Sequence, residues 1–245
     1  MREKIKIMTH LYLIRHGQAI SATQNVVGNT RLSPLGIIQA ERLRDRLAAT
    51  HEISADVLIS STMLRARHTA EIIAPALNLP IIFDEEVEEW RDGDAEGMPD
   101  EEYQALFRDI PLEQRALRRV IPSAESWAEF HLRLATALHR ITHEYEGKTI
   151  VIVCHGNFIE GTFLTFFGVN TLSFARACFF HTRNTSLTHW HTMNLEGFPP
   201  MWSLDYYNDF THIRDIDTQG RIPWQNLTPI QDAGKSKTET PTQAE

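Results

Sequence analysis

Four short apolar runs, rich in the β-branched residues Val and Ile, recur along the chain and alternate with segments that carry helical signals. Each run has the length of a buried strand, and continuous apolar strands are typical of parallel sheets covered on both faces. The runs occupy residues 11–14, 57–59, 81–83 and 150–153. This alternation of strands and helices predicts an α/β domain with a mostly parallel sheet.

The helical segments have recognisable start signals. Ser33 followed by Pro34 is typical of a helix N-terminus, where a hydroxyl caps the first turn and proline fits the first helical position. The segment 63–77 is predicted to be a second helix that ends near its internal proline. Either Ser123 or Ser126 is expected to cap a long third helix. The apolar stripe of that helix consists of Trp127, Phe130, Leu134, Leu138 and Ile141.

Three segments depart from this alternation of strands and helices. Residues 85–125 are rich in acids and arginines and contain three prolines, which favours an insertion over one end of the sheet. Together with the long helix, they predict a largely helical cap over residues 85–145. Residues 185–193 alternate like an edge or antiparallel strand. The polar residues 226–245 predict a disordered tail behind a single domain of residues 1–225.

Composition limits the class of protein. A chain of 245 residues with 42% hydrophobic residues suffices for one large core, and the net charge of −8 disfavours nucleic-acid binding. Its two cysteines, Cys154 and Cys178, form neither a disulfide framework nor a C-x-x-C pair, which favours a reducing compartment. No run reaches the ~18 apolar residues of a membrane span. We therefore expect a soluble, cytoplasmic protein without a membrane partner.

Two of the apolar runs end in the same dipeptide, His-Gly. The stretch HLYLIRHGQA, residues 10–19, ends its strand in Arg15 and His16, and TIVIVCHGN, residues 149–157, ends in His155. Ligands of open α/β sheets bind beyond the carboxyl ends of the strands, so both histidines are predicted to face one pocket. The glycine after each histidine allows a tight turn and close approach to a ligand.

A third strand, residues 56–61, leads into a helix that carries Arg65 in its first turns. Arginines and histidines at neighbouring strand ends suit a tetrahedral dianion, because guanidinium groups grip phosphate oxygens with paired hydrogen bonds. Nearby cations also disfavour protonated imidazole, which leaves one histidine free to act as a nucleophile. A leaving alkoxide then needs a proton donor. The acidic run 84–90, with Glu85, Glu86, Glu88 and Glu89, offers the candidates.

These blocks resemble the histidine phosphatase superfamily, also called the phosphoglycerate mutase-like superfamily. Arg15-His16-Gly17, followed by Gln18, fits the family's signature triplet at the end of its first strand. Four later blocks also resemble the family: LSPLGIIQA, SSTMLRARHTA, VEEWRDGDAEG and IVIVCHG. The match covers roughly residues 10–190 in the family's order, which is far more specific than a lone triplet. It implies a three-layer α/β sandwich of the phosphoglycerate mutase-like type with a helical cap.

The resemblance also implies roles for single residues. His16 would be the nucleophile that takes the phosphoryl group, and Glu89 would protonate the leaving oxygen and later activate water. Arg15, Arg65 and His155 would hold the phosphoryl oxygens. Gln18 and Asn25 follow the triplet and are candidate substrate contacts, and the segment 184–186 is expected to border the pocket. Members of this kind need no metal or other cofactor.

The sequence therefore predicts a metal-independent phosphomonoester hydrolase that acts through a phosphohistidine intermediate on His16, with a small phosphorylated substrate. One alternative is a phosphoglycerate mutase, which returns the phosphoryl group to a sugar acid. The chain lacks a segment like the mutases' extended substrate-binding motif, which favours the hydrolase. The other alternative is a catalytically inactive module that binds phosphorylated ligands, and the intact set of Arg15, His16, Arg65 and His155 argues against it.

Overall fold

The structure is a computed structural model that describes residues 8–169 and 180–217. Cys178 and the predicted tail, residues 226–245, lie outside the described residues. The contacts within the chain divide it into one compact unit, Met1–Asp215, and a second unit, Ile216–Glu245. The first unit contains every element discussed below. The boundaries of the domain, the cap and the tail stay predictions.

A sheet of six strands, in the order β3-β2-β4-β1-β5-β6, forms the centre of the described part of this unit. The strands β3, β2, β4 and β1 run parallel, whereas β5 is antiparallel to both β1 and β6. The prediction of a mostly parallel α/β sheet is confirmed. The strands are β1 (His10–Arg15), β2 (Val57–Ser61), β3 (Ile81–Asp84), β4 (Thr149–Cys154), β5 (Leu187–Met193) and β6 (Met201–Asp209).

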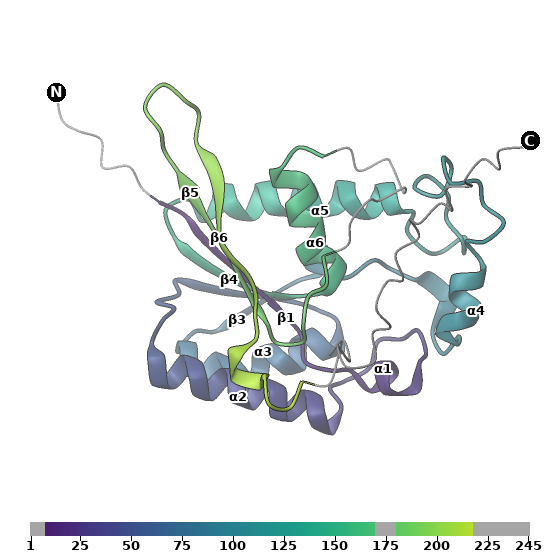
Figure 1. Cartoon of the computed structure of the whole chain (residues 1–245), viewed down its shortest axis with the longest axis horizontal. Coiled ribbons are helices and arrows are strands. Elements are labelled where there is room, and N and C mark those ends of the chain that lie inside the picture. Colours follow the sequence, from purple (N-terminus) through teal and green to yellow (C-terminus); the bar gives the residue numbers. More distant parts are fainter. Residues whose placement is uncertain (1–7, 170–179, 218–245) are drawn as a thin grey trace, which may run out of the picture. The chain divides into compact units, whose positions relative to one another are not determined.

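Helices cover both faces of the sheet and complete the three layers (Figure 1). The helices α2 (Pro34–Thr50) and α3 (Leu64–Leu77) cover one face, and α5 (Trp127–Glu144) and α6 (Gly156–Phe166) cover the other. Successive residues of β1 pack alternately against the helices on the two faces of the sheet. Leu13 packs with the cluster that includes Phe130 and Phe158, whereas Ile14 packs with the cluster that includes Leu43 and Ile73. This double burial explains why the strands are continuous apolar runs.

The helix starts follow the chemistry of the sequence. The hydroxyl of Ser33 accepts a hydrogen bond from the Gly36 amide at 3.1 Å, directly before Pro34 in the first helical position. Ser126, rather than Ser123, caps α5, and Glu129 completes a reciprocal capping box with it. The second predicted helix ends near its proline, as expected. Pro75 lies inside α3, which ends two residues later at Leu77.

The last strand of the sheet differs from the prediction. The strand predicted over 185–193 is antiparallel but is not an edge, because β6 pairs with its outer side and was not predicted. Within the predicted cap, residues 85–145, α5 contributes its apolar face to the core beneath the sheet. The remainder forms short elements: η1 (Glu85–Val87), η2 (Gly93–Ala95) and α4 (Asp100–Ala105).

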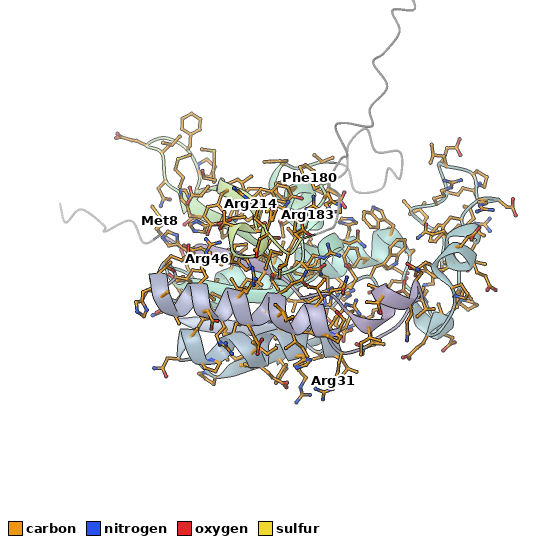
Figure 2. The ribbon with its side chains drawn as sticks, turned by 60° about the horizontal axis from the view of Figure 1, so that its bottom comes forward. Met8, Arg31, Arg46, Phe180, Arg183 and Arg214 are labelled. Carbon is orange, nitrogen blue, oxygen red and sulfur yellow. The ribbon has the colours of Figure 1, made fainter. Side chains whose placement is uncertain are left out.

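Side-chain contacts hold the carboxyl end of β6 to the layer of α2. Arg46 of α2, labelled in Figure 2, donates hydrogen bonds to Asp209 at 2.7 Å and to the Thr211 hydroxyl at 2.9 Å. Its guanidinium also pairs with Glu52 at 2.6 Å. Thr211 begins the short helix η3 (Thr211–Ile213), so one arginine fixes the point at which the chain leaves the sheet. None of the described helices is both long and apolar enough to span a membrane.

Candidate active site

The carboxyl ends of three neighbouring strands bring the predicted site residues together. Arg15 ends β1 and pairs with Cys154, the last residue of β4. The next residue of each strand is a histidine, so His16 and His155 lie side by side, with their ring centroids 5.1 Å apart. His155 also serves as the N-cap residue of α6. The register of two parallel strands thus creates the pair.

The ring of His16 is fixed through both nitrogens. Its Nδ1 lies 2.6 Å from the carbonyl oxygen of Gly17, which can only accept a hydrogen bond. Nδ1 therefore carries the proton, and Nε2 keeps its lone pair. Nε2 accepts a hydrogen bond from Nε of Arg65 at 3.1 Å. The lone pair thus points to the side on which the arginine lies.

The surroundings keep both imidazoles neutral. Burial lowers the pKa of His16 well below its usual 6.5, and the positive charges of Arg65 and Arg15 lower it further. The pKa of His155 is also lowered well below 6.5, first by burial and then by Arg65, His16 and Arg15. His16 is 7% exposed and His155 is fully buried. An unprotonated imidazole with one accessible nitrogen is a nucleophile.

The loop after β1 packs backbone against backbone. A Cβ added to Gly17 would lie 2.5 Å from the carbonyl oxygen of Gly36, and one added to Gly36 would lie 2.1 Å from the carbonyl oxygen of Gln18. The Gly17 amide donates to the Thr69 hydroxyl at 3.1 Å. Both glycines are therefore needed for the close approach of the His16 loop to the start of α2.

Residues from the late part of the chain hold the same loop from its other side. Asn184 donates its side-chain amide to the carbonyl oxygen of His16 at 2.9 Å, and the Thr185 amide donates to that of Arg15 at 2.8 Å. The Arg15 guanidinium also donates to the carbonyl oxygen of Thr182. The segment 184–186 does not line the cavity that His16 lines, but it holds the backbone of the His16 loop in position.

Cationic and neutral nitrogen donors gather around His16. Burial lowers the pKa of Arg15, and the Glu89 carboxylate partly offsets this, so the guanidinium stays charged. Nε of Arg15 and Nδ1 of His155 are buried and have no hydrogen-bond partner among the described residues. Nε2 of His155 lies 2.8 Å from the Ser61 hydroxyl. Buried polar atoms without partners are rare in proteins and indicate a missing acceptor such as an anion.

Glu89 is the member of the acidic run that lines the same cavity as His16. Its two carboxylate oxygens accept hydrogen bonds from the backbone amides of Trp90 at 3.0 Å and Asn157 at 3.1 Å. The neighbouring Glu88 instead bonds to Arg91 at 2.9 Å and to Thr62. Glu89 is therefore fixed in orientation in the cavity that His16 also lines, at the start of α6.

The cavity has a volume of about 620 Å³. Its floor holds Arg15, His16, Arg65 and Glu89, and its walls come from the loop after β1 and from the segment between β3 and α5. The apolar wall residues include Val26, Val27, Trp90, Phe107 and Trp127. The polar wall residues include Asp92, Asp100, Tyr103, Gln104, Arg108 and Arg115.

Three predicted contacts do not line this cavity: Gln18, Asn25 and His155, which is fully buried beside His16. The Gln18 side chain accepts a hydrogen bond from the Ser33 hydroxyl at 2.8 Å, so it faces the start of α2. Asn25 is the C-cap of α1 (Ile20–Gln24), with a left-handed φ of 54°, and its carbonyl accepts from the Asp100 amide. Asparagine tolerates this conformation, so its position after the triplet reflects a helix end. The sequence pattern gave no sign of Asp92, Thr69 or Ser61 as neighbours of the site, although Ser61 ends a predicted strand.

Across residues 8–169 and 180–217, no three His, Cys, Asp or Glu side chains are placed so that they could hold a metal ion. The closest spacing on α5, between His139 and His143, puts the ring centroids 6.2 Å apart, with no third ligand in that arrangement.

Comparison with known proteins gives the family. A sequence profile described as "Histidine phosphatase superfamily (branch 1)" matches residues 11–198. The chain is 28% identical over 207 residues to the "Uncharacterized phosphatase PhoE" of Bacillus subtilis, which covers 84% of this chain and 97% of that protein. It is 25% identical to the "Putative phosphoserine phosphatase 2" of Hydrogenobacter thermophilus, over 85% of this chain and 100% of that protein.

Solved structures agree with the fold. A phosphoserine phosphatase mutant from Entamoeba histolytica, in complex with phosphoserine, superposes with a TM-score of 0.65 at 24% identity and covers 84% of this chain and 99% of that one. A phosphoglycerate mutase from Bacillus anthracis gives 0.66 at 21% identity, covering 84% and 95%. The sequence match and the fold lead to one conclusion: the chain belongs to branch 1 of the histidine phosphatase superfamily.

Proposed function

We propose that this chain hydrolyses phosphomonoesters of small molecules through a covalent phosphohistidine on Nε2 of His16. The observation that carries this proposal is the state of the His16 ring. Its Nδ1 proton is held by the Gly17 carbonyl, burial and two arginines lower its pKa, and its unprotonated Nε2 accepts a hydrogen bond from Arg65 in a residue that lines a cavity. Such a ring is a ready nucleophile for phosphorus.

In the first step, the lone pair on Nε2 of His16 forms the N–P bond while the bond from phosphorus to the ester oxygen breaks. Negative charge spreads over the three remaining phosphoryl oxygens during this transfer. The guanidinium groups of Arg15 and Arg65 and the His155 ring supply donors for these oxygens. Fixed donors of this kind stabilise charge as it develops and need no rearrangement.

The alcohol leaves with the bonding electrons and takes a proton, which we assign to Glu89. In the second step, Glu89 accepts a proton from water as the water oxygen attacks phosphorus. The N–P bond breaks, inorganic phosphate leaves and the His16 ring returns to its starting state. The two backbone amides that hold Glu89 keep its carboxyl group in place through both steps.

We further propose that the enzyme works in the cytoplasm as a single domain of residues 1–225. The thiol of Cys154 is free and fully buried, which is compatible with a reducing compartment.

The first experiment measures phosphate release from 4-nitrophenyl phosphate in the presence of a chelator. The natural protein should turn over at an unchanged rate with the chelator, and His16→Ala should lose at least about a thousandfold, since no other group replaces the nucleophile. His143→Ala, at an exposed position of α5, is the matched control and should keep the natural rate. Full activity in His16→Ala would overturn the proposal.

A second experiment looks for the intermediate itself. Brief reaction with a phosphate-labelled substrate, followed by a quench in strong base, should leave label on the natural protein and none on His16→Ala. Adding 2,3-bisphosphoglycerate with 3-phosphoglycerate then separates the two family reactions. Transfer of label to the sugar acid faster than to water would show a mutase, and binding without labelling would show an inactive module.

A further inference from the structure

The cavity above His16 carries polar side chains that the proposed phosphoryl transfer does not use. Asp92, Asp100 and Tyr103 line it together with His16 and Glu89. Asp92 lies in the loop before η2, and the other two belong to α4. These residues are available to the part of the substrate that lies beyond the phosphate.

The buried Tyr103 hydroxyl has no well-formed hydrogen bond among the described residues. The side chain is only 6% exposed and packs edge-on against Phe107, with ring centroids 5.8 Å apart. Its hydroxyl lies near enough to Asp92 to lower that carboxyl's pKa, but it makes no well-formed hydrogen bond with any described residue. A buried hydroxyl without a partner costs free energy, so a ligand group that meets it would bind favourably.

The charges around Asp92 determine which ligand group fits. Burial, together with the nearby carboxylates of Glu89 and Asp100, raises the pKa of Asp92 to about 6, although Tyr103 and Arg65 act to lower it. At neutral pH this corner of the cavity therefore holds three carboxylates facing one guanidinium. A cation gains from all three, whereas a neutral hydroxyl gains from one hydrogen bond. The charged residues of the adjoining hollow are Glu88, Arg91 and Glu96.

We propose that Asp92 and Tyr103 form a subsite for a cationic amine on the alcohol part of the substrate, so that the enzyme prefers aminoalkyl phosphates. This inference rests on the proposed function, because it names the substrate class of the same site. The ammonium group donates hydrogen bonds to the Asp92 carboxylate and to the oxygen of the Tyr103 hydroxyl. The phosphate remains on the floor of the cavity, among the arginines.

Two further arginines line the same cavity and would attract an anion instead. Nε of Arg115 already donates to the carbonyl oxygen of Ile110 at 2.9 Å, and its Nη2 donates to that of Arg108 at 3.4 Å. Arg108 itself is exposed. A substrate with a carboxylate beside its phosphate is therefore the competing possibility that the experiment must separate.

Three phosphomonoesters of nearly equal size form the test: 2-aminoethyl phosphate, propyl phosphate and phosphoglycolate, which are cationic, neutral and anionic in the alcohol part. We expect kcat/KM at pH 7.5 to be about tenfold higher for the amine than for the propyl compound, as one charged hydrogen bond gives. The ratio of the two values is the readout. A ratio near one, or a preference for phosphoglycolate, would overturn the inference.

Variants assign the preference to its residues. Asp92→Asn should bring the amine-to-propyl ratio close to one, and Tyr103→Phe should lower it partway. Asp109→Asn, an exposed change in the same segment, is the matched control and should keep the natural ratio. An unchanged amine-to-propyl ratio in Asp92→Asn would show that a group other than Asp92 binds the amine.

The pH dependence gives an independent readout. Because the carboxyl of Asp92 ionises near pH 6, the preference for the amine should be weak at pH 5 and rise to its full value by pH 7.5. The substrate phosphate also titrates near pH 6, so the comparison is made with Asp92→Asn. The rise should be missing from that variant, and a rise of equal size there would contradict the assignment.

A binding measurement separates this inference from the proposed function. His16→Ala cannot form the phosphohistidine, so calorimetry on it reports affinity for the three intact compounds. If the amine binds more tightly than the other two compounds, and Asp92→Asn removes this difference, the subsite is supported even if no hydrolysis is found. Hydrolysis that depends on His16, without any selection for the amine, would overturn the subsite alone.

Discussion

At the scale of single residues, His16 is buried and stays unprotonated at a mildly acidic pH at which an exposed histidine would carry a second ring proton. Its low pKa follows from burial away from water and from two neighbouring guanidinium groups. Arg15 lies at the carboxyl end of β1, and Arg65 lies in α3. The same low pKa has a consequence for folding. The unfolded chain binds a proton on this ring below about pH 6.5, and the folded chain does not.

We therefore predict that His16→Gln reduces the loss of stability in acid. Between pH 7.5 and pH 5.5, the natural protein should lose about 1 kcal/mol more unfolding free energy than the variant does. In this range the His16 ring takes up a proton in the unfolded chain but not in the folded chain, which stabilises the unfolded state. Urea denaturation at the two pH values measures the difference. His143→Gln, on the exposed face of α5, should follow the natural protein, and equal losses in all three proteins would contradict the prediction.

Gly36 gives a second prediction at this scale. Gly36→Ala would place its Cβ 2.1 Å from a backbone oxygen, so α2 or the His16 loop must move. We expect a loss of about 1–3 kcal/mol of unfolding free energy, together with a loss of phosphatase activity. Gly28→Ala is the control for stability, because its Cβ would meet the nearest atom at 3.8 Å. Thermal unfolding of both variants provides the comparison.

At the scale of elements, the periodicity of the sequence predicts the parallel part of the sheet and its covering helices well. A strand that is covered on both faces is a continuous apolar run in the sequence. In β4, for example, the residues from Ile150 to Cys154 are fully buried. The edge strand β6 is only partly buried along its length, so MWSLDYYND shows neither a continuous run nor a clear alternation. Its pairing with β5 is also irregular between Leu187 and Trp190.

The elements of the site were predictable to different extents. The two histidines and Arg65 could be predicted because each follows a strand end, and strand ends of a parallel sheet share one edge. Asp92 and Tyr103 come from a segment of short helices without periodicity, so their place in the cavity depends on tertiary packing. Gln18 does not line the cavity, because its side chain accepts a hydrogen bond from the Ser33 hydroxyl at the start of α2.

The start of α5 provides the prediction that belongs to this scale. Ser126→Ala removes the hydroxyl that accepts from the Glu129 amide and should cost about 1 kcal/mol of unfolding free energy. Thr142→Ala, whose hydroxyl donates to the Leu138 carbonyl within the same helix, should change stability by about half of that or less. Urea denaturation of both variants is the measurement, and an equal effect would argue that the cap contributes nothing special.

At the scale of the whole molecule, an acidic protein holds a positive site. The net charge is −8, yet two partly buried guanidinium groups line the cavity. Long-range attraction therefore contributes little to substrate capture, and the anion is held by short contacts inside the cavity. Burial lowers the pKa of Arg15, and repulsion from the positive charge of Arg65 lowers it further, so both effects reduce the stability of the fold.

Filling the site with an anion should therefore stabilise the entire fold. Inorganic phosphate at about one hundred times its dissociation constant adds about 2.7 kcal/mol, which corresponds to a rise of roughly 5–10 °C in Tm for a domain of this size. Differential scanning calorimetry measures the rise, with potassium chloride at equal ionic strength as the control. Arg65→Ala should lose most of it, and an equal rise in that variant would place the phosphate elsewhere.

The bonds that Asn184 and Thr185 make to the His16 loop join parts of the chain that lie 168 or more residues apart. A ribosome that adds roughly 5–20 residues per second needs on the order of ten to thirty seconds to pass from one partner to the other. During that time the loop that carries His16 lacks the contacts that Asn184 and Thr185 supply. The loop should therefore reach its final geometry only after residue 185 has been synthesised, so the nascent chain should lack activity until then.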